Sequence, residues 1–460
     1  MAVWSIIHTS EIDIKDRFDA EYFQPKFLEV AMKVHEDDWP TLGEICNVTA
    51  SAFYPAATEL YSRGEIPFIR CVDTINYPVI SDIQTDKFKR LPQDFLSSHK
   101  NLKTMRNGDV VITKVGTPCY ASVIDTSLGK VVLSRTVLGL KNIRIDPHYL
   151  VAFLRSKYGF YQLMRERELI IQLQLTLERV KRIKVFIPRN KRHVINISNR
   201  LKEHCSYLRH SMMKYNRAKQ MLLNELGVKN LDLSPSLFCA VNLKDVKEFH
   251  RLDAEYYQPK YERVIEHLKK NFDTKSLGEA IPDITTGQYC DEYVRHEGKP
   301  YIRGVDISNM SVNMDKLAYI SPQRQVENKI AKEGDIVVSR VGTIGLSARL
   351  PKEVEGGTVS DNLIRLRFDQ EKIDSYYLAL FLGSDIGTNM MVRCSRGSVQ
   401  QRLNQETLKE IPLPLLPMAK QKELADLVIQ SHQARRKAKE FLEEAKKKVE
   451  YLIEGKGYAI

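Results

Sequence analysis

The chain has 460 residues, of which 43% are hydrophobic, and this composition predicts a folded protein of two or three domains rather than a disordered one. No run of about 18 apolar residues occurs, and the N-terminus lacks a basic start and a long apolar core, so we expect no membrane span and no signal peptide. The net charge of +12, with a pI of about 9.1, suits a nucleic-acid partner, although many basic proteins bind none.

The seven cysteines are odd in number and scattered, and no Cys-x-x-Cys pair occurs. The eleven histidines are also dispersed, without metal-ligand spacing to a cysteine or to another histidine. These patterns indicate neither a disulfide framework nor a metal site. We therefore expect a cytoplasmic protein.

An internal repeat is the strongest signal in the chain. Arg17–Phe27 (RFDAEYFQPKF) returns as Arg251–Tyr261 (RLDAEYYQPKY), with eight identities in eleven positions. Further matches follow in the same order: Thr41–Ile45 with Ser276–Ala280, Pro67–Asp73 with Pro300–Asp306, Asn107–Thr117 with Glu333–Thr343, and Asp146–Leu150 with Asp374–Leu378. Solenoid repeats have periods of roughly 20–50 residues, so this much longer repeat predicts a duplicated domain.

Each half opens with a short predicted helix. Asp13 or Asp16 is a candidate cap for the first copy and Asp245 for the second, and we expect Pro25 and Pro259 to interrupt or end these helices.

A mixed region follows the opening helix in each half. Val110–Thr113 and Ile336–Ser339 are β-branched and flanked by Gly-Asp turns, which predicts strands, and residues 131–133 and 362–368 predict further strands. Helical spacing then follows an aspartate in Tyr149–Arg155 and Tyr377–Leu382. The fold class is therefore α+β, with two homologous mixed α/β domains.

Each mixed region ends at prolines and is followed by a long predicted helix with an a/d heptad seam. Gly227 and Gly455 lie where C-terminal caps belong. A narrow seam suits a facing helix, so we favour mutual pairing of the two helices over packing of each on its own domain. The predicted interface residues are Leu201, Leu208, Met212, Leu222, Leu424, Val428, Leu442 and Val449. The predicted domains are 1–188, the first mixed domain; 189–228, the central helix; 229–416, the second mixed domain; and 417–460, the C-terminal helix.

Motifs of common active sites are absent from the sequence. There is no P-loop, no Asn-Pro-Pro-aromatic tetrapeptide, no Gly-x-Gly turn after a strand, no His-Glu-x-x-His and no Gly-x-Ser-x-Gly. Asp283 follows Pro282 as in some metal-dependent nucleases, but no convincing Glu-x-Lys follows on a strand. We predict no catalytic residue and no metal in this chain.

Two kinds of loop are candidate DNA contacts. Lys114–Thr117 and Arg340–Gly345 each follow a strand, and their glycines expose backbone N–H groups beside a cation, which favours a phosphate. The alternative is a tight turn with a solvated cation. The residues proposed from these two loops are Lys114, Thr117, Arg340 and Thr343.

Arg396–Arg402 is rich in amide and hydroxyl groups, and Gln and Arg are suited to pair with adenine and guanine in the major groove. Its counterpart near Gln172–Gln174 is more apolar, as expected if two domains read different sequences. A helix N-cap loop with solvated polar groups is the alternative. The candidates from this loop are Arg396, Ser398, Gln400 and Gln401.

The order of these motifs, repeated twice, resembles the specificity subunit of type I restriction–modification systems. Ile411–Gln421 is especially similar to the family's entry into its helical spacer. The resemblance implies two target-recognition domains at opposite ends of an antiparallel coiled-coil helix pair, with a pseudo-two-fold internal repeat. Each domain would read half of a bipartite DNA site, and inserting about four residues in each helix should lengthen the spacer between the halves.

The same resemblance implies the partners. They are double-stranded DNA, two methyltransferase subunits docked by the helices, and motor–nuclease restriction subunits. The complex methylates adenine or cleaves DNA, and S-adenosylmethionine, ATP and Mg are expected on the partner subunits, with no cofactor in this chain. Two alternatives stay open: an autonomous DNA-modifying or DNA-cleaving enzyme with a cryptic site, and a scaffold that binds two proteins rather than DNA.

Overall fold

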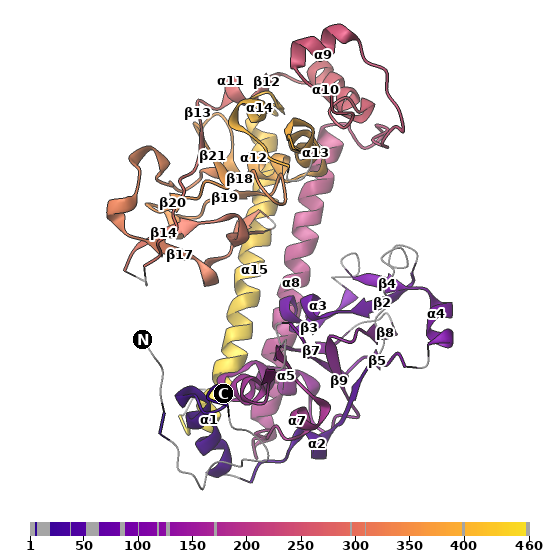
Figure 1. Ribbon diagram of the computed structural model, residues 1–460, viewed down its shortest axis with the longest axis vertical. Coiled ribbons are helices and arrows are strands. Elements are labelled where there is room, and N and C mark those ends of the chain that lie inside the picture. The colour runs from indigo at the N-terminus through magenta and orange to yellow at the C-terminus, as the bar shows by residue number, and fades with distance from the viewer. Residues whose placement is uncertain are drawn as a thin grey trace. The chain divides into compact units, whose positions relative to one another are not determined.

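The computed structural model describes residues 5–6, 19–36, 38–51, 64–82, 88–99, 101–116, 119–125, 129–169, 173–294, 297–308, 310–397 and 401–456. Contacts divide the chain into a first unit, Met1–His210 with Ala434–Ile460, and a second unit, Ser211–Gln433. Each long helix therefore contributes to both units (Figure 1). Among the described residues, no helix is both long enough and apolar enough to span a membrane.

The described residues of the first unit form a five-stranded sheet, a four-stranded sheet and a two-stranded hairpin. The five-stranded sheet has the order β1 (Asn47–Ala50), β9 (Val137–Lys141), β6 (Val110–Thr113), β7 (Ala121–Ile124) and β3 (Val79–Ile80). The four-stranded sheet has the order β4 (Lys89–Leu91), β2 (Ile66–Ile69), β8 (Lys130–Leu133) and β5 (Thr104–Arg106). A two-stranded hairpin joins β10 (Glu168–Leu169) to β11 (Leu173–Gln174). The shorter helices are α1 (Pro25–Glu36), α2 (Leu42–Ile45), α3 (Cys71–Asn76), α4 (Gln93–Ser98), α5 (Pro147–Arg155), α6 (Lys157–Arg165) and α7 (Leu177–Lys181).

The described residues of the second unit also form two larger sheets and, in addition, two strand pairs. One sheet has the order β13 (Asp283–Thr286), β21 (Leu363–Arg367), β18 (Ile336–Ser339) and β19 (Ser347–Arg349), and another has β17 (Ala318–Ile320), β14 (Lys299–Ile302) and β20 (Thr358–Val359). Two strand pairs are β12 (Thr274–Ser276) with β22 (Pro412–Pro414), and β15 (Ile307–Ser308) with β16 (Ser311–Val312). Its shorter α-helices are α9 (Leu243–Phe249), α10 (Pro259–Asn271), α11 (Leu277–Ala280), α12 (Ser375–Leu382), α13 (Asp385–Cys394) and α14 (Gln405–Lys409). Short 3₁₀ helices cover Gly304–Asp306, Met314–Lys316, Pro322–Arg324, Glu327–Lys329 and Lys352–Val354.

The predicted central strands are confirmed, and their register repeats. Val110 of β6 pairs with Leu140 of β9, and Ile336 of β18 pairs with Leu366 of β21, in both cases antiparallel. All four residues of β6 and of β18 are buried, and the first three of each are apolar and β-branched, as suits a buried strand. The duplication therefore extends from the sequence to strand pairing.

The predicted helices after an aspartate are also confirmed. The Asp146 carboxylate accepts hydrogen bonds from two backbone N–H groups of the first turn of α5, and Asp374 does the same for α12. One buried tyrosine in each helix donates its hydroxyl to a backbone carbonyl near the end of the mixed region: Tyr149 to Phe186 at 2.7 Å and Tyr377 to Pro414 at 2.6 Å. These bonds anchor the chain just before each long helix.

The prediction for the two prolines of the repeat was wrong. Pro25 is the first residue of α1 and Pro259 is the first residue of α10, so both begin a helix rather than end one. Proline suits this position because the first N–H groups of a helix have no partner within the helix. The N-cap of α9 is Asn242, and Asp245 lies in its first turn, so Asp245 is not the cap; Asp13 and Asp16 lie outside the described residues.

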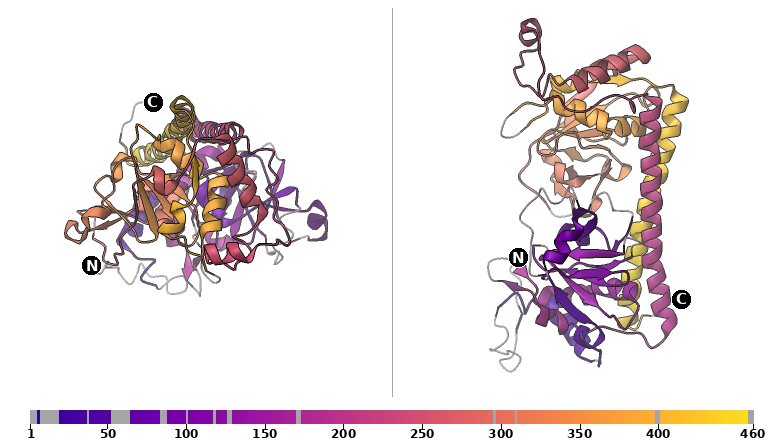
Figure 2. Two further views of the ribbon diagram at one scale, coloured as in Figure 1. Left: turned by 90° about the horizontal axis from the view of Figure 1, so that it is seen from above. Right: turned by 90° about the vertical axis from the view of Figure 1, so that its right-hand side faces the viewer.

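The long helices α8 (Lys191–Glu225) and α15 (Met418–Ile453) pair antiparallel within each unit. In the first unit, Lys448 Nζ donates to Asn196 Oδ1 at 2.8 Å, and Arg200 pairs with Glu444 at 3.3 Å. In the second unit, Ser431 Oγ donates to the Ser211 carbonyl at 2.8 Å. The helices lie side by side in both views of Figure 2.

The predicted interface positions differ in burial. Leu201, Leu222, Leu424, Val428 and Val449 are fully buried, whereas Leu208, Met212 and Leu442 are half-buried. The buried ones also belong to the cores of the mixed domains, so both packing modes that the sequence suggested are present at once. The helix-bounded limits 1–188, 189–228, 229–416 and 417–460 stay a prediction.

Candidate nucleic-acid interface

The glycine loop after the central strand is built in the same way in both units. Thr113 Oγ1 accepts from Tyr120 N–H at 2.9 Å, and Ser339 Oγ accepts from Leu346 N–H at 2.9 Å, so a hydroxyl at the end of the strand closes each loop. Gly116 and Gly342 have φ values of +89° and +78°, and a Cβ at either position would meet no atom within 4 Å. Glycine is required there for backbone conformation, and the loop surface stays open.

The second candidate loop lies beside the glycine loop in each unit. Arg402 pairs with Arg396 through two backbone hydrogen bonds, of 2.9 and 2.7 Å, and also forms a bridge with Val341. In the first unit, Gln174 pairs with Glu168 and forms a bridge with Val115. The two loops that the sequence singled out separately are therefore adjacent, and Gln174 is the structural counterpart of Arg402.

The individual candidates occupy different environments. Lys114 is half-buried, whereas Thr343, Arg396 and Gln401 are exposed. The Arg340 guanidinium is half-buried and forms a brace, because Nε donates to the Leu403 carbonyl at 3.2 Å and Nη1 to the Asp361 carbonyl at 3.3 Å. Three of the candidates lie outside the described residues: Thr117, Ser398 and Gln400.

Sequence reasoning missed a turn that precedes the next strand of each central sheet. In the second unit, Ser360 N–H donates to the Ile302 carbonyl at 2.9 Å, and Arg340 N–H donates to the Asn362 carbonyl at 3.0 Å. In the first unit, Ser134 N–H donates to Ile69 at 2.9 Å and Lys114 N–H to Thr136 at 2.8 Å. The turns place Arg135-Thr136 and Asp361-Asn362 next to the glycine loops. The only sequence signal was the opposite charge of Arg135 and Asp361, which follow the predicted strand 131–133 and precede the predicted strand 362–368, respectively.

In each unit, an arginine that is ion-paired with an aspartate follows the strand to which this turn is hydrogen-bonded. Arg70 donates from Nε and Nη2 to the two carboxylate oxygens of Asp73, at 3.1 and 3.2 Å, and Arg303 binds Asp306 in the same way at 3.0 and 3.1 Å. Both aspartates are almost fully buried, while the arginine side chains are about 30% exposed. A fixed guanidinium that still reaches solvent is suited to contact an anion.

A cavity of about 700 Å³ opens between these elements in the second unit. It is lined by Tyr289, Tyr293 and Arg303 and by Ser360, Asp361 and Asn362 of the turn. Gly342 and Thr343 of the glycine loop line the same cavity. The loop predicted from sequence therefore contributes one side of a larger concave surface.

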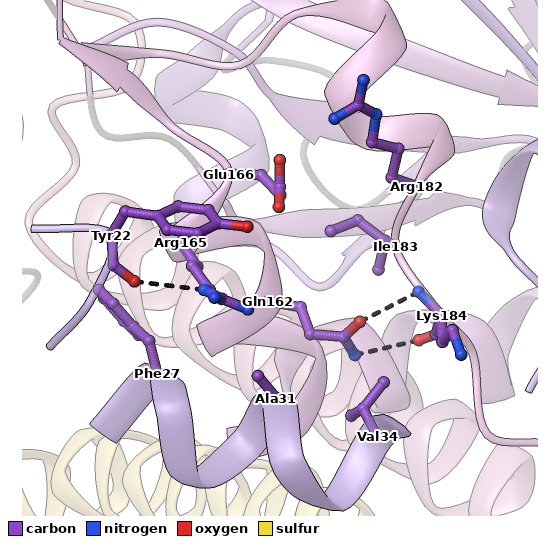
Figure 3. Close-up of a pocket in the computed structure, with 10 residues that line it drawn as sticks. All are labelled: Tyr22, Phe27, Ala31, Val34, Gln162, Arg165, Glu166, Arg182, Ile183 and Lys184. Atoms are coloured by element: carbon purple, nitrogen blue, oxygen red, sulfur yellow. Dashed lines mark hydrogen bonds between the residues drawn. The ribbon is translucent and has the colours of Figure 1, made fainter. Parts of the chain in front are cut away.

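The repeated Asp-Ala-Glu-Tyr motif has a different role. Arg165 Nε donates to the Tyr22 carbonyl at 3.2 Å, and its guanidinium lies over the Tyr22 ring, 3.9 Å from the centroid. These two residues line a pocket of about 200 Å³ in the first unit, where Gln162 also makes two 3.0 Å hydrogen bonds to the Lys184 backbone (Figure 3). The polar side chains here tie α1, α6 and the end of the mixed region together, so the motif frames the domain.

The carboxylate that resembled the start of a nuclease motif is engaged in an ion pair. Asp283 Oδ2 accepts from Arg365 Nη2 at 2.5 Å, and Asp283 Oδ1 accepts from Thr285. Nearby, Asp335 accepts two hydrogen bonds from Arg367, at 2.9 and 2.7 Å. Within the parts of the chain that are described, no group of three or more His, Cys, Asp or Glu side chains could hold a metal ion.

Most of the second repeat matches a known protein family. Residues 270–436 match the family of the type I restriction modification DNA specificity domain. A protein described as the type I restriction enzyme MjaX specificity subunit of Methanocaldococcus jannaschii is 27% identical over 172 residues, which are 36% of this chain and 40% of that relative. The matched part thus spans less than half of the curated relative.

Solved structures that match this chain are distant from it in sequence. A type I restriction–modification system S subunit from M. genitalium has a TM-score of 0.43 and 13% identity, covering 91% of this chain and 96% of that one. An HsdS subunit from Thermoanaerobacter tengcongensis has a TM-score of 0.30 and 14% identity, with the same coverage.

Proposed function

We propose that this chain, which carries a type I restriction modification DNA specificity domain and resembles the specificity subunits of those systems, is the non-catalytic subunit that selects the DNA sequence. Each unit would read one half of a bipartite duplex site. The proposal extends to the first repeat, which the family match does not cover, because the backbone framework of the two repeats is the same.

The observation that carries the proposal is a shared framework with divergent exposed side chains. Lys114 and Arg340 each donate a backbone N–H to the same turn position, and the adjoining hairpins bridge to the glycine loops in the same register. The side chains on this framework differ: Glu168 stands where Arg396 does, and Gln174 where Arg402 does. A duplicated reader of two different half-sites needs this combination.

The net charge of +12 favours DNA over protein as the ligand of these surfaces. The paired Arg70 and Arg303 add cations that are held in place by buried aspartates. Phosphate contacts from such groups would hold the duplex, while other side chains discriminate between bases. This charge and its placement distinguish the proposal from the scaffold alternative.

Two methyltransferase subunits and motor–nuclease subunits complete the proposed complex, with S-adenosylmethionine, ATP and Mg on those partners. The helices α8 and α15 would dock the methyltransferase subunits, because several of their basic side chains point to solvent, among them Arg209, Arg217, Lys422 and Arg436. In this arrangement the purified chain alone would transfer no methyl group.

The test uses the purified full chain and a pool of randomised DNA duplexes. Selection should enrich a bipartite sequence, and the affinity for that sequence should fall steeply as salt is raised, because counterions are released on binding. Enrichment of no sequence would contradict the proposal. Methyl transfer by the chain alone would instead favour the alternative of an autonomous modifying enzyme.

A further inference from the structure

The cavity of the second unit is lined by both aromatic and polar side chains. Tyr289 and Tyr293 are 69% and 52% exposed, so their rings are accessible to a ligand. Both tyrosines line the open space of about 700 Å³ together with Ser360, Asp361 and Asn362. The shape and the aromatic walls suit the faces of bases or sugars.

A buried hydroxyl among the residues that line this cavity, that of Ser360, has no hydrogen-bond partner among the described residues. Ser360 is 2% exposed, and its Oγ contacts no donor or acceptor. Its counterpart in the first unit, Ser134, does have one, because its Oγ lies 2.5 Å from Thr136 Oγ1. Buried polar groups are nearly always paired, so the unpaired hydroxyl indicates that the cavity receives a polar guest.

Asp361, next to this serine, is held by its backbone while its side chain is available. Its N–H donates to the Gln288 carbonyl at 3.0 Å, and its carbonyl accepts from Arg340 Nη1. The carboxylate forms no hydrogen bond or ion pair with the described residues, although it lines the cavity. A fixed backbone under an unused carboxylate gives the acceptor a defined position.

A carboxylate at a DNA surface adds no affinity, because it repels phosphate. It does discriminate between bases, since an ionised carboxylate only accepts hydrogen bonds and pairs with the exocyclic amino group of cytosine. The adjacent Asn362 is exposed and has the amide geometry that pairs with adenine. Cations for attraction are Arg303, which lines the cavity, and the exposed Arg396, whose partner Arg402 bridges to Val341 of the glycine loop.

The first unit has the same turn with the opposite charge. Arg135 occupies the position of Asp361, and Thr136 that of Asn362, on a turn closed by equivalent bonds from Val137 to Ser134 and from Leu363 to Ser360. Arg135 is exposed, and an arginine donates to guanine O6 and N7. The two turns thus have the same backbone hydrogen bonds, but the Arg135 side chain can only donate hydrogen bonds where the Asp361 carboxylate only accepts them.

We infer that these matched turns, Arg135-Thr136 and Asp361-Asn362, are the specificity-determining positions of the two units. Asp361 accepts a hydrogen bond from a cytosine amino group, and Arg135 donates to a guanine in the other half of the site. This inference rests on the proposed function, since it names where each unit discriminates between bases.

The experiment selects bound sequences from a randomised duplex pool with the full chain and its variants. Asp361→Ala should lower the preference for cytosine at one position of one half-site by roughly ten- to a hundred-fold, the range expected for one base-specific pair. Preferences in the other half-site should not change, and Arg135→Ala should give the reverse pattern. The matched control is Glu371→Ala, which removes an exposed carboxylate beyond the other end of β21.

The possible results separate the inference from the function on which it rests. If the wild-type chain enriches no sequence, the proposed function fails and the inference fails with it. If the wild type is selective and both variants keep every preference, or change affinity equally for all sequences, the function stands and the inference is overturned. Asp361→Asn has nearly the same shape as the wild-type side chain and serves if Asp361→Ala lowers the melting temperature; it should move the preference at that position from cytosine toward adenine, because an amide both donates and accepts.

Discussion

The guanidinium of Arg393 lies over the ring of Tyr256, 4.6 Å from its centroid, and Arg393 Nε donates to the carbonyl of the same tyrosine at 3.1 Å. The first unit repeats this arrangement with Arg165 and Tyr22. In the second unit, Arg251 also lies 4.6 Å from the Tyr256 centroid and binds Asp253 with two hydrogen bonds. The Asp253 hydrogen bond raises the pKa of Arg251, and the Arg251 hydrogen bond lowers the pKa of Asp253. The tyrosine of the repeated Asp-Ala-Glu-Tyr motif is thus held by Arg165 or Arg393 from outside the motif and, in the second unit, also by Arg251 beside it.

Arg393→Ala should therefore destabilise the second unit by about 2 kcal/mol, the sum of a cation–π contact and one or two charge-assisted hydrogen bonds. The measurement is the urea midpoint of the transition that reports the second unit. Arg436→Ala, which removes an exposed arginine from α15, is the matched control and should change the midpoint little. Equal midpoints for the two variants would show that the stacked arginine contributes nothing.

The two buried serines of the helix pair form a coupled polar contact. Ser211 and Ser431 are each 1% exposed, and their hydroxyls lie 3.0 Å apart. Either Ser→Ala substitution should cost about 1 kcal/mol, because it leaves the other hydroxyl with fewer partners, and the double variant should cost less than the sum. A double-mutant cycle by chemical unfolding measures the coupling. Strict additivity would exclude a direct interaction.

Stability should fall in acid because of His204, whose Nδ1 donates to the Ala438 carbonyl at 2.7 Å. Burial, together with the Arg155 charge, lowers the pKa of His204 from 6.5 to about 4. A depressed pKa means that the unfolded chain binds the proton first, so the contribution is complete above about pH 6.5 and is lost as the pH falls toward 4, by at most about 3 kcal/mol. Urea midpoints between pH 7 and 5 should fall less steeply for His204→Asn, which keeps a donor near the position of Nδ1. Parallel pH profiles would refute this assignment.

A predicted role and an observed role of Arg340 can be separated by experiment. The sequence predicts a phosphate contact, so Arg340→Ala should weaken DNA binding almost uniformly across sequences. The observed brace to the Leu403 and Asp361 carbonyls adds a second expectation, since lysine keeps the charge but not the forked geometry. Rescue of affinity by Arg340→Lys would identify a charge contact, and failure of rescue with a lowered melting temperature would identify the brace. A change of base preference in the lysine variant would assign Arg340 to base reading instead.

The helix pair should also set the distance between the half-sites. Inserting about four residues in both α8 and α15 lengthens each helix by ~6 Å at about 1.5 Å per residue. The selected DNA sites should then contain a longer spacer with unchanged half-site sequences. Unchanged spacers in a folded variant would disprove the ruler hypothesis.

The sequence by itself determined the duplication, the central strands and the long helices. These features depend on local patterns: β-branched runs between Gly-Asp turns, aspartates that cap α5 and α12, and heptad seams. The position of a single residue within a helix was predicted less accurately than the helix itself. Pro25 and Pro259 were assigned to the wrong end of their helices, because proline is compatible with the first turn as well as with a break.

Only the tertiary structure decided which loops meet. Arg340 contacts residues 361 and 403, and Ser360 joins the strand that ends at Ile302, and these contacts arise only when strands far apart in the chain pair in register. The sequence singled out the glycine loop and the hairpin but gave no reason to place Asp361 and Asn362 between the glycine loop and an aromatic wall. Neither residue has a motif of its own. Their importance comes from long-range hydrogen bonds that no local pattern contains.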